Sequence, residues 1–368
     1  MANSAMVPSL YVSFKRRTYG YQTSTKLTII SLQNQDAPIS KQSLPDGREL
    51  IRTAFLRKGL NEKSAEIMTD SIASSTLKQY QSTFKLWIDF AKKNNINVLE
   101  ASVPEVISFL TKRFEEGASY STLNTTRSAI ALISDSDLSS DGLLSRFLKG
   151  VYRKKPTKPR YSSTWDVSPV LEYLKKLHPL KDLKLKEAAE KVTTLLALTT
   201  AHRLQTLALI NIKNIKVSTT GITIKIPDII KTSKPGSNQP ELMLPFFKDN
   251  SSICTASVIL EYLEYTKNLR SDNNKMLLIS TIKPYGPASP QTLGHWVKSI
   301  LQKAGVDTNQ FSAYSTRHAA VSAAYKNGVS IDTIRRTAGW SQNSHTFAKF
   351  YNRPIQSSEK FAHAILKQ

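Results

Sequence analysis

The sequence predicts a mainly α-helical fold with a small antiparallel sheet, organised as a helical N-terminal domain followed by an α+β C-terminal domain. Apolar residues recur at helical spacing through the first half of the chain and again in the second half. In the second half, isoleucines at positions 222, 224 and 226 alternate with other residues beside a Gly-containing turn, as is typical of a β-hairpin. A chain of 368 residues is long enough for two domains with sizeable cores.

Charge is the strongest signal in the composition. Lys and Arg total 51 against 28 acidic residues, a formal net charge of +23. Such an excess favours a polyanionic partner, and nucleic acid fits because its phosphate backbone releases counterions on binding. A ribosome-associated protein, or one that is merely basic, has the same composition. No segment approaches ~20 consecutive apolar residues, so no membrane partner is expected.

Cysteine and histidine usage argues against structural cross-links. Cys254 is the only cysteine, which excludes an intramolecular disulfide and favours a reducing compartment. The six histidines are scattered, without the i,i+4 spacing beside acids that marks a helical metal site. We therefore expect neither a metal nor a cofactor.

The N-terminal region divides into an arm and a helical domain. Residues 1–46 are rich in Ser, Thr, Gln and Asn without apolar periodicity, which predicts a flexible arm. Residues 47–151 are predicted to form a bundle of four helices. Capping and stop residues predict three of these helices: Ser74 or Ser75 to about Asn95, Val103 with Pro104 to Gly117, and Gly142 to Gly150. Apolar residues from Tyr120 to Ile133 mark the other one.

A basic segment joins the two predicted domains. Residues 152–163 hold two prolines and five basic residues, Arg153, Lys154, Lys155, Lys158 and Arg160. Prolines prevent a helix and stiffen the segment, while the charges favour contact with a phosphate backbone. We predict a linker that crosses DNA, although a nuclear-localisation signal has the same composition.

Residues 164–354 are predicted to form the α+β domain. The expected elements are a helix from Ser168, a helix from Leu185, a hairpin with its turn at Ser218 to Gly221, a third strand from Leu242 to Phe246, a helix from Ile253 to Lys267, a short strand from Met276 to Ser280, and a helix opened by Pro290. Within the Pro290 helix, Trp296 lies on an apolar stripe, so we expect it to pack in the core.

Short helices with glycine stops complete this domain. One is expected to stop at Asn327 and Gly328, and Ser330 is expected to cap a second that ends at Gly339. A third is expected to begin near Ser344 or Thr346. Residues 355–368 are predicted to form an amphipathic tail helix.

The polar residues at these helix junctions resemble the C-terminal signature of the tyrosine recombinases, the phage-integrase family. The matching residues are Tyr314-Ser315-Thr316-Arg317-His318, Ala338-Gly339-Trp340 and Phe350-Tyr351, in wording most similar to DIRS-like retrotransposons. Upstream, Thr199 to Arg203 resembles the family's first arginine box, with Ala201 in place of the common Gly and Thr206 in place of the common acid. The resemblance implies a helical core-binding domain followed by a tyrosine-recombinase catalytic domain.

The resemblance also implies a reaction and a set of residues. A site-specific recombinase of this family cuts and rejoins DNA through a covalent 3′-phosphotyrosine, here in the service of integrating a mobile element. The implied catalytic residues are Arg203, Lys231, Tyr314, Arg317, His318, Trp340 and Tyr351. Lys231 best matches the family's lysine, but Lys234 competes with it and either lysine can instead contact DNA. Tyr351 is the implied nucleophile.

One position departs from the family pattern. Most relatives carry His where this chain carries Tyr314. A phenol with a pKa near ~10 is a poor general base at neutral pH, although it can hydrogen-bond the phosphate or the nucleophile. His318, beside Arg317, is the other candidate for handling the proton. The sequence leaves the choice of base open.

The implied partners are double-stranded DNA and further copies of the chain, as a dimer on one site and a tetramer in synapsis. The nucleus is the expected location in a eukaryotic host, and otherwise the cytoplasm on DNA. Two other functions remain open, a type IB topoisomerase-like nicking and closing enzyme and a catalytically silent, domesticated DNA-binding protein. Tyr314 is the residue that favours the silent alternative.

Overall fold

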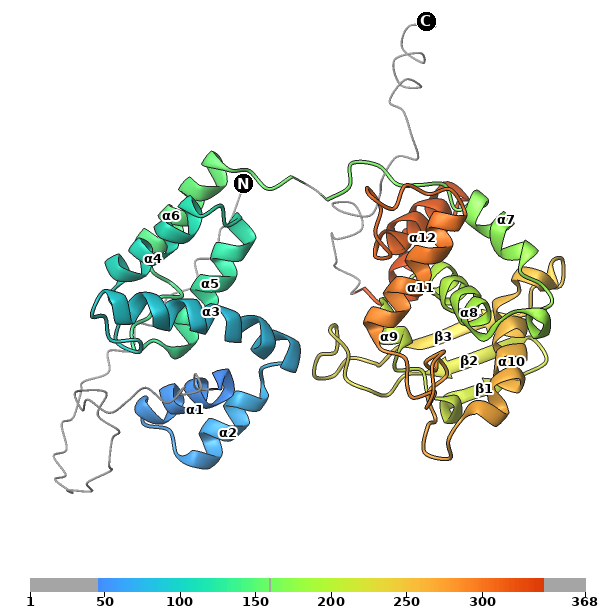
Figure 1. The fold of residues 1–368 in the computed structure, drawn as a ribbon, viewed down its shortest axis with the longest axis horizontal. Helices are drawn as coiled ribbons and strands as arrows, with labels where there is room; N and C mark the ends of the chain where they lie inside the picture. Colours follow the sequence, from blue (N-terminus) through green and yellow to red (C-terminus); the bar gives the residue numbers. More distant parts are fainter. Residues whose placement is uncertain (1–45, 159, 341–368) are drawn as a thin grey trace, which may run out of the picture. The chain divides into compact units, whose positions relative to one another are not determined.

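The computed structural model describes residues 46–158 and 160–340, and the chain divides after Thr157 into two compact units (Figure 1). The division falls within the basic segment that was predicted to link two domains. Each unit has a hydrophobic core of its own, as expected of domains. The predicted arm, except for residue 46, and the predicted tail helix lie outside the described residues.

The N-terminal unit is helical throughout its described residues. Its core forms around α3 and α4, where Trp87 lies 5.2 Å from Phe109 between ring centroids and donates its indole N–H to the Val98 carbonyl at 3.1 Å. Ser102 and Glu105 form a capping box at the start of α4. The helices are α1 (Gly47–Arg57), α2 (Glu62–Asp70), α3 (Ser74–Lys93), α4 (Val103–Glu115), α5 (Tyr120–Ile133) and α6 (Gly142–Lys154).

Two details of this unit differ from the sequence prediction. The prediction of four helices is wrong, because α1 and α2 precede them; α2 buries only Ala65 and Thr69, too few positions to show a periodicity. Helix α6 also continues past Gly150, because Val151 packs in the core. It ends at Lys154, since the ring of Pro156 disfavours helical backbone at Lys155. The first residues of the predicted linker are therefore helical.

The C-terminal unit combines helices with one small sheet. Over its described residues the elements are α7 (Ser168–Lys176), η1 (Leu180–Asp182), α8 (Leu185–Thr200), α9 (Leu204–Leu207), η2 (Ile212–Asn214), β1 (Ile215–Val217), β2 (Gly221–Lys225), β3 (Glu241–Pro245), η3 (Ser251–Ile253), α10 (Thr255–Thr266), η4 (Lys267–Leu269), α11 (Pro290–Lys303), α12 (Ser315–Lys326) and α13 (Ile331–Thr337). The predicted fold class, mainly helical with a small antiparallel sheet, is confirmed.

The sheet is antiparallel with strand order β1-β2-β3, which confirms the predicted hairpin and third strand. Gly221 is required by close approach, because a Cβ built there would lie 2.3 Å from the Leu244 carbonyl oxygen. The predicted strand from Met276 to Ser280 is wrong. Its residues make two isolated bridges to separate parts of the chain, Asn211 to Met276 and Ile279 to Pro287, so no continuous ladder forms.

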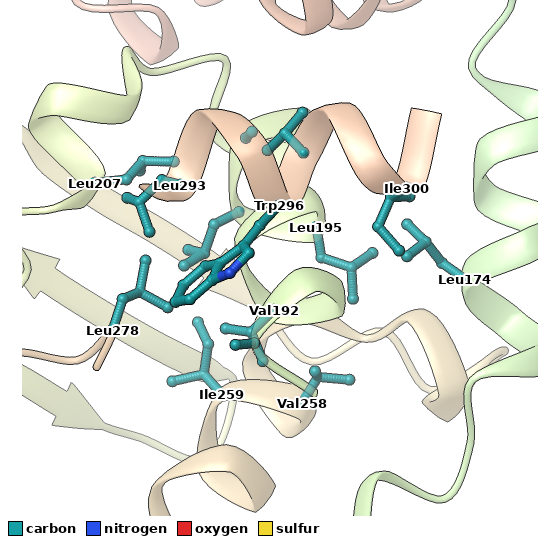
Figure 2. Packing of buried hydrophobic residues seen from close by; sticks show 14 of the residues in the cluster. Leu174, Val192, Leu195, Leu207, Val258, Ile259, Leu278, Leu293, Trp296 and Ile300 are labelled. Atoms are coloured by element: carbon teal, nitrogen blue, oxygen red, sulfur yellow. The ribbon is translucent and has the colours of Figure 1, made fainter. Parts of the chain in front are cut away.

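Helix α8 is the centre of this unit, and α10, α11 and α12 pack against it. Trp296 of α11 lies among Val192, Leu278 and Ile259 and is only 4% exposed, which confirms its predicted place in the core (Figure 2). An amphipathic helix with a single apolar stripe would lie at the surface, whereas α8 is buried on most of its circumference. The end of α8 is therefore held firmly, and it leads directly into the first predicted arginine.

None of the helices in the described ranges combines the length and the apolar character needed to cross a bilayer.

Candidate functional site

Four of the predicted site residues line one pocket in the C-terminal unit. The pocket has a volume of about 510 Å³ and brings together Arg203, Lys231, Tyr314 and Arg317. These residues come from the start of α9, the loop between β2 and β3, and the start of α12. Asp and Glu do not occur among the described residues that line it. Three cationic side chains around one cavity favour an anionic ligand.

A slightly larger pocket, of about 590 Å³, lies in the N-terminal unit and is a weaker candidate. Its lining includes Arg48, Arg52 and Glu62. Those charges pair locally, because Arg48 bonds Asp70 and Arg52 bonds both Glu49 and Glu62. Basic groups already paired with carboxylates at a surface offer little attraction to a further anion.

Arg203 stands directly after a strained turn. Helix α8 ends at Thr200, and the next residue, Ala201, has a left-handed backbone with φ of 50° and ψ of 20°. The left-handed conformation is sterically unfavourable for a residue with a Cβ, but not for Gly. Position 201 is also where the sequence departs from the glycine of the resembled motif. Arg203 then serves as the N-terminal flank of α9, half-buried at the pocket.

Arg317 fastens three segments together. Its side chain is buried, and its two terminal nitrogens donate hydrogen bonds of 2.7 Å each, one to the Ala201 carbonyl and one to the Ala338 carbonyl. Its guanidinium carbon also lies 4.7 Å from the ring centroid of Trp340. Arg317 thus joins the strained end of α8, the end of α13 and the tryptophan of the third motif.

His202 is buried and feels the charges of both arginines, so its imidazole is neutral at pH 7. Burial is the main cause that lowers the pKa of its imidazole from 6.5 to about 4, and the charges of Arg317 and Arg203 act in the same direction. A hydrogen bond with the Thr337 backbone opposes the shift. Gly339 lies against the ring, since a Cβ built at Gly339 would be 3.1 Å from Cε1 of His202. With φ of +66°, Gly339 also has a backbone that favours glycine.

Tyr314 and His318, the two candidates for the base, lie in contact. Their ring centroids are 5.6 Å apart in an edge-to-face arrangement. Tyr314 is 44% exposed and lines the pocket, whereas His318 is 7% exposed and sits one turn further along α12. Of the two side chains, the phenol is the one that a ligand in the pocket can reach.

The two candidate lysines differ in position. Lys231 lines the pocket, and Lys234 does not. Lys234 instead belongs to a local turn, in which its backbone N–H donates to the Ser237 hydroxyl at 3.0 Å and its carbonyl accepts from that hydroxyl at 2.7 Å. The loop is braced further by a 2.9 Å hydrogen bond from the Ser233 hydroxyl to the Gln239 side chain. Both lysines are exposed.

The other predicted residues are not among those that line the pocket, or they lie outside the described residues. Tyr351 is outside them. The predicted DNA-contacting residues of the basic segment, Arg153, Lys154, Lys155, Lys158 and Arg160, are all exposed. Lys155 also donates from Nζ to the Gly117 carbonyl at 2.8 Å.

Several pocket residues were not predicted from the sequence. His202, Gln205, Gln291 and Thr316 also line it. His202 and Gln205 flank the predicted Arg203, and Thr316 precedes Arg317, so proximity to a predicted arginine was an available signal. Gln291 lies near the start of α11, and only the tertiary structure brings it to the site.

A cluster of His, Cys, Asp and Glu that could hold a metal ion does not occur among residues 46–158 and 160–340.

Comparison with known families and structures identifies the architecture. Residues 170–357 match the phage integrase family, and residues 65–132 match the phage integrase N-terminal SAM-like domain. Comparison with curated protein sequences finds no match.

Solved structures with the same fold include three recombinases. The XerH site-specific recombinase in a post-cleavage complex with its difH substrate is 14% identical, with a TM-score of 0.58 over 88% of this chain and 95% of that one. Lambda integrase (75-356) as a dimer on a COC′ core site is 15% identical, with a TM-score of 0.52 over 83% and 96%. The Tn1549 transposon integrase in complex with circular intermediate DNA is 12% identical, with a TM-score of 0.50 over 88% and 99%.

These structures share the fold, while the family models cover more than half of the sequence, including both arginine motifs and both units. The chain therefore belongs to the phage integrase, or tyrosine recombinase, family, with an N-terminal SAM-like domain.

Proposed function

We propose that the chain is a site-specific DNA recombinase that cleaves and rejoins strands through a covalent 3′-phosphotyrosine at Tyr351. The observation that carries the proposal is the convergence of Arg203, Lys231 and Arg317 on one pocket without acidic lining residues in the described part of the chain. A metal-independent attack on a phosphodiester needs this kind of concentrated positive charge. Membership of the phage integrase family supports the same chemistry.

In the proposed reaction the Tyr351 phenol oxygen attacks phosphorus. A bond forms between that oxygen and phosphorus, the bond from phosphorus to the 5′ oxygen breaks, and the phosphoryl group stays on the enzyme. Arg203 and Arg317 neutralise the nonbridging oxygens, because guanidinium stays charged and binds oxyanions through paired N–H groups. Trp340 adds one indole N–H donor. Religation is the reverse attack by a 5′ hydroxyl.

Two protons move in this step. Lys231 gives a proton to the leaving 5′ oxygen, and the pocket position of Lys231 rather than Lys234 supports that assignment. The phenol of Tyr351 loses its proton to a base, for which Tyr314 and His318 are the candidates. Their rings are in contact, with centroids 5.6 Å apart, and Tyr314 lines the pocket whereas His318 does not, which supports Tyr314 as the group nearer to the phenol and His318 as its partner.

We propose double-stranded DNA as the substrate, contacted by the basic segment from Arg153 to Arg160. The solved neighbours support this partner, because the Tn1549 integrase was solved with circular intermediate DNA, lambda integrase on a COC′ core site and the XerH recombinase with its difH substrate. The lambda integrase complex is a dimer, in keeping with a dimer on one site and a tetramer in synapsis for this chain. The wording of the motifs supports a DIRS-like mobile element and a nuclear location.

A suicide-substrate experiment tests the proposal. The protein is incubated with a pool of nicked duplexes of random sequence, from which the fragment released on cleavage diffuses away and traps the covalent adduct. Wild-type protein should give an adduct that survives denaturing electrophoresis, and Tyr351→Phe should give none. Sequencing the trapped DNA then gives the preferred site. An adduct that persists in Tyr351→Phe would mean that another residue is the nucleophile.

A catalytically silent DNA-binding protein is the second candidate, favoured by Tyr314 in the position where the family commonly has His. It predicts DNA binding without any adduct in the same assay. A type IB topoisomerase-like activity, the third possibility, predicts relaxation of supercoiled plasmids of any sequence and adducts without a preferred site.

A further inference from the structure

The start of α12, which carries Arg317 and His318, is held by a segment that begins at the end of the basic linker. That segment is residues 161–165, and its side chains Tyr161 and Trp165 are 4% and 7% exposed. They lie about 150 positions before their partners in the sequence. Because these contacts come from a distant part of the sequence, the position of the first turn of α12 depends on residues 161–165 as well as on the helix itself.

Hydrogen bonds attach this segment to the residues at the start of α12. The Trp165 indole N–H donates to the Ser315 hydroxyl at 2.8 Å, and that hydroxyl donates to the Ser312 carbonyl at 2.7 Å. The Tyr161 hydroxyl shares a 2.7 Å hydrogen bond with the Ser312 hydroxyl and accepts a 3.3 Å one from the Ser312 backbone N–H. Tyr161 therefore bonds Ser312, just before α12, and Trp165 bonds Ser315, its first residue. Both serines lie one and a half helical turns or less before Arg317.

Ring contacts extend the attachment toward the pocket. The Tyr161 ring lies 5.4 Å from the His318 ring between centroids, and the Tyr314 ring lies 5.6 Å from the same His318 ring. Tyr161 also packs against Phe311 at 5.6 Å. The base candidate His318 thus contacts both the attached Tyr161 and the pocket-lining Tyr314.

The attachment begins where the linker charges end. The guanidinium carbon of exposed Arg160 lies 5.6 Å from the centroid of the Tyr161 ring. Within the linker, Arg160 is the last of the basic residues predicted to contact DNA. A phosphate held by Arg160 would therefore lie next to the side chain that bonds the start of α12.

We propose that Tyr161 and Trp165 are positioning residues, which hold the first turn of α12 so that Arg317 and His318 meet the phosphate in the pocket. The inference rests on the proposed function, because it assigns the two residues to the rate of strand cleavage and not to DNA affinity. Neither side chain lines the pocket, so neither touches the reacting atoms.

The test compares Tyr161→Phe with the matched control Tyr265→Phe. Each removes one phenol oxygen, and Tyr265 donates at 3.0 Å to the Leu183 carbonyl, away from α12. DNA affinity is measured by anisotropy, and the single-turnover rate of adduct formation is measured on the nicked duplexes. We expect Tyr161→Phe to bind DNA within about twofold of wild type and to form adduct roughly tenfold more slowly, the scale of one or two lost hydrogen bonds. The control should stay within about twofold in both.

Trp165→Phe and Ser315→Ala, singly and together, test the second contact. If the pair acts as a unit, the double variant should be no slower than the slower single variant. If the rate loss of the double variant equals the product of the two single losses, Trp165 does not act through Ser315 and its role is overturned. Equal rates of adduct formation for Tyr161→Phe and Tyr265→Phe would overturn the role of Tyr161.

A readout without cleavage separates this inference from the proposed function. Amide hydrogen exchange at residues 315–318 should be faster in Tyr161→Phe than in Tyr265→Phe. If wild-type protein forms no adduct, the proposed function fails while this measurement still decides whether the attachment holds α12. Equal exchange in the two variants would show that Tyr161 does not hold α12. A loss of DNA affinity in Tyr161→Phe large enough to explain the whole loss of rate would overturn its role as a positioning residue.

Discussion

The two sides of the cationic pocket are built differently. One side is a buried wall, in which Arg317 bonds two backbone carbonyls and His202 packs against Gly339. The other side is the loop between β2 and β3, which presents the exposed Lys231. Side chains in the wall hold the fold together and shape the site at once, whereas a loop lysine can serve chemistry with little effect on folding. Variants on the two sides should therefore separate stability from activity.

The largest expected effect on stability is that of Arg317→Ala. It leaves the buried Ala201 and Ala338 carbonyls without their donor and should lower the free energy of unfolding of the C-terminal unit by roughly 3 kcal/mol. Tryptophan fluorescence in a urea titration measures it, since three of the four tryptophans, Trp165, Trp296 and Trp340, belong to that unit, while Trp87 belongs to the other and its signal is common to both variants. The exposed Arg336→Ala is the control and should stay within about 0.5 kcal/mol. Equal losses in the two variants would refute the distinction between wall and surface.

The buried His202 should make stability depend on pH. Its pKa is lowered from 6.5 to about 4, so between these values the unfolded chain binds a proton that the folded protein does not. Stability should therefore fall as the pH falls through this window, by about 2 kcal/mol between about pH 7 and about pH 5. His202→Gln should lack this component, which urea titrations at both pH values would show as the difference between wild type and variant. An identical fall in both proteins would mean that His202 is not responsible.

An effect smaller than that of Arg317→Ala is expected for Gly339→Ala. The substitution adds a Cβ to a left-handed backbone and places it 3.1 Å from Cε1 of His202, so we expect a loss of about 2 kcal/mol. Gly328→Ala is a matched control, since its φ is +84° but nothing lies within 4 Å of the added Cβ. It should cost about 1 kcal/mol. The difference between the two variants, measured by thermal unfolding, reports the contact with His202, and it should vanish in a His202→Ala background.

The smallest effect on stability is expected on the loop side. Lys231→Ala should leave the free energy of unfolding within about 0.5 kcal/mol of wild type, because the side chain is exposed. It should nevertheless slow adduct formation by roughly 100-fold or more, the scale of a lost general acid. Lys234→Ala, in the same loop but outside the pocket lining, should slow adduct formation far less.

A rescue experiment tests the role of Lys231 as the acid. A duplex with a 5′-phosphorothiolate leaving group, which needs no proton, should restore the rate of Lys231→Ala. The reverse order of the two lysines would assign the acid to Lys234.

Local sequence patterns predicted helices well where an apolar stripe began next to a capping residue. Ser330 caps α13 as predicted, with its hydroxyl accepting from the Thr333 N–H at 3.3 Å. Patterns failed where burial was slight, as in α2, and where a buried apolar run lacked a continuous partner strand, as at Met276 to Ser280. Periodicity reports which face is buried, and it cannot report whether a neighbouring strand is present.

The sequence by itself determined the excess of positive charge, the two-part organisation and the residue types of the motifs, because these depend on composition and on neighbours a few positions away. Only the tertiary structure decided that Lys231 rather than Lys234 lines the pocket, that His202 is buried and neutral, and that Tyr161 and Trp165 hold α12. Arg317 meets the Ala201 carbonyl across 116 positions of the chain. Contacts at such separations arise from how helices pack around α8, and no local pattern carries that information.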